Sequence, residues 1–342
     1  MQKLSILSAT RKSNLFAVAT FALTACIAAA KSLAATYSSA EAAPAGTGTA
    51  AMAAAAESAV PVAAHLFPLL AAALSAAALA AAGALTLRAT ARTGVLGAFC
   101  TLPLPLFGFA AFGLCFAPSM LLPAISSLGV AAGMAAYFHV IRNHGEKDLL
   151  LHGSVSFALA ALIYPPCILL GLLIPAAAII FPLTWRQIVT ALAGWLLPLL
   201  AAGYACWLTG GHFADALLRL TDPDSSAMLR YTASASVSML PLTAVLPAGV
   251  LMLTILAGAL RFALIRQSML VRMRSSMAIA YVALALTLGG ALLPGAGVGW
   301  LATAAVPAAV TASFGLEKCP PRTSEHLYRI LLLGLAVHLF LT

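Results

Sequence analysis

Charged residues are scarce in this chain, where Asp, Glu, Lys and Arg together make up 8% of 342 residues. A soluble globular domain carries about 25% charged residues, because water must solvate its surface. Hydrophobic residues make up 63% of the chain, so most of its surface is expected to face lipid. The scarcity of charge therefore excludes an ordinary water-soluble domain and indicates an integral membrane protein.

The chain also lacks segments of alternating apolar and polar residues, which strands of a membrane barrel show over about ten residues. Several of its apolar runs instead exceed the roughly 20 residues that a helix needs to cross a bilayer. We therefore predict an all-α fold: a polytopic transmembrane helix bundle of about 11 spans in one domain, residues 1–342. The expected spans cover residues 14–36, 61–87, 94–115, 119–141, 149–164, 167–183, 188–208, 241–263, 276–294, 298–316 and 326–342.

Two segments fall outside these spans. Residues 37–60 are rich in Ala, Gly and Ser and predict a low-complexity external loop, and residues 209–240 predict an external polar loop. The first apolar run, Leu15–Ala30, is expected to be an uncleaved span. It contains "LTAC" ending at Cys26, which also matches a lipoprotein cleavage box, so lipidation of that cysteine is the alternative.

Charge is absent between Asp148 and Arg186, yet this stretch holds two adjacent prolines, Pro165 and Pro166. A single helix from Leu149 to Pro182 would be about 51 Å long, against a hydrocarbon core of about 30 Å. Proline lacks a backbone donor and disfavours helical geometry at the preceding residue, here Tyr164. The sequence therefore predicts a broken helical hairpin at 149–183, whose arms cross the membrane or enter it from one side.

The positions of the basic residues support this hairpin. With a cytoplasmic N-terminus and two passes at 149–183, fifteen of the 18 Lys and Arg residues fall on the cytoplasmic side, as the positive-inside rule requires. Only Lys31, Arg219 and Arg230 fall outside. We therefore expect a multi-pass inner-membrane protein with its N-terminus cytoplasmic and its C-terminus external. The net charge of +9 is explained by this asymmetry, so nucleic acid is not expected as a partner.

Ionisable residues are missing from the middle of every expected span, which weighs against ion-coupled transport. The six cysteines show no ligand spacing, so no metal site is expected. The Gly-rich segment 289–300 lacks the Lys-Ser/Thr of a phosphate loop, and no cofactor is expected.

The candidate catalytic residues are confined to the two external loops. General acid or base chemistry needs carboxylates or histidines in defined positions. The candidates are Glu41, Glu57, His212, Asp215, Arg219, Asp222, Asp224 and Arg230. A structural interpretation competes for most of them: Asp215 and Arg219 have the spacing of a surface ion pair, and Asp222 that of a helix cap.

The segment 261–276, "RFALIRQSMLVRMRSS", is the densest basic cluster in the chain. Arg266, Arg272 and Arg274 are expected to set the topology at the headgroup level, and a lipid-headgroup site is the alternative.

Residues 144–208 resemble the central part of an uncharacterised family of multi-pass inner-membrane proteins from Bacteroidota. The resemblance lies in "SFALAALIY", from Ser156 to Tyr164, and then in Trp185, Arg186, Gly194 and Pro198. The C-terminal segment 306–333 resembles the last hairpin of the same family. That family has no established activity, so the resemblance implies location and topology and no mechanism.

Three functions remain open. We expect a multi-pass inner-membrane protein that is a non-catalytic membrane or envelope-assembly component. Besides the lipid bilayer, its partner would be another membrane protein or a second copy of the chain. The alternative is an enzyme similar to glycosyltransferases that use polyprenyl-phosphate sugars, working on the external face near Glu41, Glu57 and the loop 209–238. The third is an uncoupled transporter of a small apolar solute or lipid, which needs no charged residues.

Overall fold

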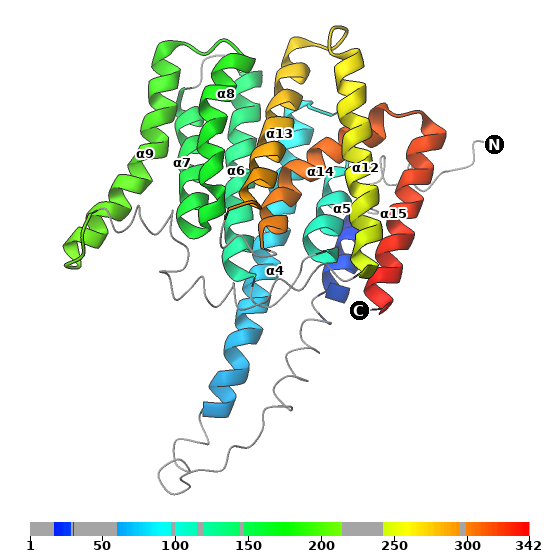
Figure 1. Cartoon of the computed structure of the whole chain (residues 1–342), viewed down its shortest axis with the longest axis horizontal. Coiled ribbons are helices and arrows are strands. Elements are labelled where there is room, and N and C mark those ends of the chain that lie inside the picture. The colour runs from blue at the N-terminus through cyan, green and yellow to red at the C-terminus, as the bar shows by residue number, and fades with distance from the viewer. Residues whose placement is uncertain are drawn as a thin grey trace, which may run out of the picture.

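The computed structural model describes residues 17–28, 30, 60–96, 100–114, 120–143, 147–213, 242–293 and 299–341. Within these ranges the chain is helical and contains no strand (Figure 1). Five helices are long and apolar enough to cross a membrane: Leu70–Thr93, Leu121–Arg142, Trp185–Leu208, Ala244–Ile265 and Val271–Gly290. The all-α prediction is confirmed for the described residues, and five of the expected spans have the required length and composition.

The elements follow the chain in this order: a helix over Ala17–Ala28, α4 (Val60–Thr93), α5 (Pro103–Gly108), η1 (Phe109–Gly113), α6 (Leu121–Arg142), α7 (Lys147–Ile163), η2 (Pro165–Leu172), α8 (Leu173–Ile180), α9 (Trp185–Leu208), α12 (Leu242–Ile265), α13 (Val271–Gly290), α14 (Trp300–Lys318) and α15 (Pro321–Leu341). Several boundaries differ clearly from the sequence expectation. Helix α4 ends at Thr93, six residues after the expected end at 87, and α15 begins at Pro321, five residues before the expected start at 326. The helix expected over 94–115 covers only 103–113, and α13 begins five residues before the expected start at 276.

Helix α14 lies at the centre of the bundle. Every residue from Ala302 to Leu316 is buried, and the helix contacts α4, α5, η1, α6, α12, α13 and α15. A helix that is apolar on all sides is expected to be buried on all sides. The many alanines of α14 let neighbouring helices approach closely. The closest crossing is with α12, where a Cβ on Gly315 would clash with the carbonyl oxygen of Thr254.

Helices α6, α7 and α9 pack side by side to one side of α14 (Figure 1). Between α6 and α7, the Tyr137 hydroxyl lies 3.2 Å from the Ser154 hydroxyl, and the Tyr137 ring packs on Phe157. Between α7 and α9, a Cβ on Gly194 would stand 2.7 Å from the carbonyl oxygen of Leu151. Glycine at this position therefore allows backbone contact between the two helices.

The proline-broken hairpin is confirmed. Helix α7 ends at Ile163, and Tyr164 is extended, with φ −135° and ψ 98°. The chain continues as the 3₁₀-helix η2 and then as α8, which returns to the end where α7 began (Figure 1). Tyr164, Pro165 and Pro166 are buried, so the irregular backbone lies inside the protein, as a membrane environment requires. The eight-residue 3₁₀ stretch was not expected, since such runs rarely exceed three or four residues.

Helices α9 and α12 have the most exposed apolar surface. In the most apolar 18-residue stretch of each helix, 28% of the residues are buried in α9 and 22% in α12, against 56% in α6. The 24 residues of α9 make a helix about 36 Å long, enough to cross a bilayer core of about 30 Å. Trp185 lies at one end of α9, and Tyr204 and Trp207 lie near the other. Such aromatic side chains are typical of the two membrane interfaces.

Candidate functional site

The structure describes only one of the eight external candidates. His212 follows the end of α9 and is exposed. The other seven lie outside the described residues: Glu41, Glu57, Asp215, Arg219, Asp222, Asp224 and Arg230. The external cluster therefore remains a prediction. Among the described residues, no group of three or more His, Cys, Asp and Glu side chains is placed to hold a metal ion.

Basic segments gather at one end of the bundle. The end of α6, the start of α9 and the turns between α12 and α13 and between α14 and α15 all lie toward the upper end in Figure 1. These segments carry Arg142, Arg186, Arg261, Arg266, Arg272, Arg274, Lys318 and Arg322. Because α7 and α8 form a hairpin, the α9 start returns to the same end as the α6 terminus, as the charge pattern predicted.

The segment 264–274, which we name the arginine turn, joins α12 to α13. Arg266 and Arg272 are exposed, and Arg274 is half-buried. The turn is ordered by backbone bonds, because the Ser268 N–H donates to the Ile265 carbonyl at 3.0 Å and the Arg274 N–H to the Leu270 carbonyl at 2.9 Å. The backbone is thus ordered at all three arginines, with Arg266 between the helices and Arg272 and Arg274 at the start of α13.

No carboxylate neutralises the arginine turn within the described part of the chain. The ion pairs found there join Lys318 to Glu317 at 3.2 Å and Arg329 to Glu325, all on α14 and α15. The first turn of α13 carries no acidic residue, and its N-cap, Leu270, makes no side-chain hydrogen bond. Within the described residues, the positive charge of the turn is therefore not offset by a carboxylate.

Most of the described buried Ser and Thr hydroxyls inside the bundle form hydrogen bonds within their own helix. A buried Ser or Thr in an apolar helix can donate to the carbonyl one turn earlier, which satisfies the hydroxyl without a partner helix. Four buried hydroxyls donate in this way to backbone carbonyl oxygens at 2.6 to 2.9 Å: Thr254 to Leu251, Thr287 to Leu284, Thr311 to Pro307 and Ser313 to Ala309. These buried hydroxyls are held by their own helices.

Besides the Tyr137–Ser154 contact between α6 and α7, Ser126 and Cys167 form a second polar contact between helices, which joins α6 to the broken hairpin. The Ser126 hydroxyl donates to the Ala160 carbonyl at 3.1 Å and lies 3.2 Å from the Cys167 sulfur. Because a hydroxyl has one proton, the Cys167 thiol is the donor in the second contact. This small network holds the end of α7 and the start of η2 against α6.

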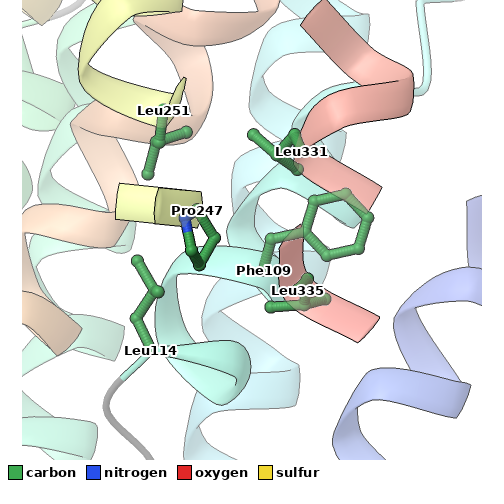
Figure 2. A pocket seen from close by; sticks show the side chains of 6 residues that line it. All are labelled: Phe109, Leu114, Pro247, Leu251, Leu331 and Leu335. Carbon is green, nitrogen blue, oxygen red and sulfur yellow. The ribbon is translucent and has the colours of Figure 1, made fainter. Parts of the chain in front are cut away.

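The described residues also line one small apolar cavity, between η1, α12 and α15 (Figure 2). Its walls are the side chains of Phe109, Leu114, Pro247, Leu251, Leu331 and Leu335. Its volume is about 10 Å³, the lower limit for one water molecule. An apolar cavity of this size is a packing defect and does not hold a substrate.

Comparisons with protein-family models, curated proteins and solved structures found no match for this chain. The fold and the surface define its class. It is an α-helical bundle with membrane-type helices, carrying basic segments at one end and apolar side chains around its outer helices.

Sequence reasoning missed two features of the described residues. Glu317 is a carboxylate with a side chain only 4% exposed, next to Lys318, and its place at the end of an apolar helix was the available signal. The second is the contact between Ser126 and Cys167, which are 41 residues apart, so that no local pattern connects them. The arginine turn, by contrast, was identified from its density of arginine.

Proposed function

We propose that this chain is a multi-pass protein of a bacterial inner membrane and acts as a non-catalytic component of a membrane or envelope assembly. About 11 segments cross or enter the bilayer in this proposal, five of them as full-length helices. The end that carries the basic segments is cytoplasmic, following the positive-inside rule, and the C-terminus is external.

The observation that carries the proposal is the exposed apolar face of α9. Its side chains Leu196, Leu197, Leu200, Tyr204 and Trp207 are 50% to 59% exposed, and the lower part of the helix leans away from its neighbours (Figure 1). A partner helix gains packing and aromatic contacts on such a face, and these drive association within a membrane. Most of the described buried Ser and Thr hydroxyls bond within their own helices, and this supports an assembly role over a reaction.

Site-specific photo-cross-linking in cells tests this proposal. A cross-linker at Leu200, on the exposed face, should yield a discrete product with another membrane protein or with a second copy of the chain. The matched control is a cross-linker at Leu199, which is only 8% exposed. Absence of a protein product from Leu200 and from the other exposed positions of α9 would contradict the assembly role.

Native mass spectrometry in a mild detergent separates the remaining alternatives. A stoichiometric protein partner supports assembly, whereas a bound polyprenyl-phosphate lipid favours the glycosyltransferase-like enzyme. In the latter case Glu41→Gln, Glu57→Gln and Asp222→Asn should abolish function at unchanged protein levels. Function that survives these changes excludes the enzyme.

A further inference from the structure

Positive charge in the arginine turn is concentrated beyond what topology alone requires. Arg266, Arg272 and Arg274 lie within nine residues of the chain, and two of the three stand in the first turns of α13. A helix N-terminus carries about half a positive charge, so arginines there are repelled by the helix itself. Like charges in one place raise the free energy of the folded protein unless an anion offsets them.

Apolar side chains are interleaved with these arginines. Leu264, Leu270 and Val271 are 76%, 78% and 64% exposed. A dissolved anion or a nucleic acid would neutralise the arginines and leave these three side chains in water. The boundary between the headgroups and the acyl chains of a membrane suits both the arginines and the apolar side chains. There arginine reaches the phosphate groups while leucine and valine stay in the hydrocarbon.

We propose that the arginine turn binds the headgroups of anionic phospholipids. Arg266 and Arg272 contact the phosphodiesters, Arg274 adds charge from its half-buried position, and Leu264, Leu270 and Val271 lie among the upper acyl carbons. Each basic residue near an anionic membrane surface contributes a factor of about five to binding, hence roughly 100-fold for three. The proposal rests on the membrane location proposed above and is independent of the assembly role.

The first test uses the unaltered protein. Purified full-length protein in a neutral detergent receives equal amounts of phosphatidylglycerol and phosphatidylcholine, and native mass spectrometry counts the lipids retained. The anionic lipid should be retained in clear excess, and inorganic phosphate should not displace it. Equal retention of the two lipids overturns the proposal, and so does displacement of phosphatidylglycerol by phosphate.

The second test compares two triple variants of equal charge. One carries Arg266→Gln, Arg272→Gln and Arg274→Gln. The control carries Arg88→Gln, Arg142→Gln and Arg186→Gln, which are exposed arginines outside the arginine turn. The first variant should lose the preference for phosphatidylglycerol by roughly 100-fold, and the control should lose clearly less, because its three arginines stand on separate segments and cannot contact one lipid together.

Two outcomes of this comparison overturn the proposal. One is an equal loss in both variants, which would mean that net charge alone attracts the lipid. The other is tight binding of an oligonucleotide by unaltered protein in phosphatidylcholine nanodiscs, with loss in the first variant, which would assign the turn to a soluble polyanion. If the first variant does not fold, the comparison of the two lipids on unaltered protein still decides.

Discussion

The hydroxyl oxygen of Ser126 and the sulfur of Cys167 lie 3.2 Å apart, joining α6 to the first turn after the proline break. Both side chains are buried, and the same hydroxyl donates to the Ala160 carbonyl, which also accepts the Tyr164 N–H. Tyr164 is extended and the two prolines after it have no N–H, so the ordinary helical bonds end here. Polar contacts from α6 replace part of what the break removes.

Removing the Ser126 hydroxyl should destabilise the protein. We expect Ser126→Ala to lower the free energy of unfolding by about 1 kcal/mol, since the Cys167 thiol loses its acceptor. The control is Ser127→Ala, because Ser127 is equally buried and donates only to Ala124 of its own helix. Thermal unfolding in detergent measures both. Equal losses of stability in the two variants would show that the contact between Ser126 and Cys167 does not contribute to the free energy of unfolding.

The crossing of α12 and α14 should not tolerate a methyl group. A Cβ on Gly315 would meet the Thr254 carbonyl oxygen and stand 3.2 Å from the Gly258 Cα. Both are backbone atoms that cannot rotate away, so Gly315→Ala should cost about 3 kcal/mol. Gly249→Ala, on the exposed side of α12, meets nothing within 4 Å and should be neutral or slightly stabilising. Unfolding midpoints in detergent check the pair, and a tolerated Gly315→Ala would mean that the helices cross less closely.

Two leucines of α15 should differ in how much they stabilise the protein, because only one of them lines the small apolar cavity. Leu335 lines it and is 3% exposed, whereas Leu333 on the same helix is 66% exposed. Leu335→Ala should destabilise the protein by about 2 kcal/mol, because the enlarged cavity loses packing contacts. Leu333→Ala should change stability by less than about 0.5 kcal/mol. Chemical or thermal unfolding of both variants is the measurement, and similar effects would place Leu333 in a packed interface.

Labelling with a membrane-impermeant maleimide should place the basic segments on one side of the membrane. Asn143→Cys, after α6, and Gln267→Cys, in the arginine turn, should react from the cytoplasmic side. His212→Cys, after α9, should react from the opposite side. Unaltered protein gives the background from native cysteines. Labelling of residues 143 and 267 from opposite sides would contradict the two-pass hairpin, because one pass over 149–183 reverses every later segment.

Much of the fold was predictable from local sequence. The apolar runs at 119–141 and 188–208 predicted α6 and α9 to within about three residues, a typical error for element ends. Pro165 and Pro166 predicted the break between α7 and η2. The prediction of a span over 94–115 was wrong in length. This run contains enough apolar residues for a span, but the described helix covers only 103–113. Composition cannot distinguish a short buried helix from a crossing helix, since both are apolar.

For the candidate site too, the sequence predicted one part and the structure added another. The arginine turn was visible as a dense cluster of one charge, and the structure adds that α13 begins at Val271, so that Arg272 and Arg274 stand in its first turns. The external candidates, with Glu41 and Asp222 among them, lie outside the described residues apart from His212.

By itself, the sequence determined that this protein is helical and apolar, where its longest helices lie and where the hairpin breaks. These properties depend on backbone chemistry and on transfer from water, which act residue by residue. Only the tertiary structure decided that α14 lies at the centre, that Gly315 meets Thr254 and that Ser126 meets Cys167. Such contacts join segments far apart in the chain, and inside a membrane every helix face is apolar. The close fit of small side chains and backbone atoms then selects the neighbours, and that fit exists only in three dimensions.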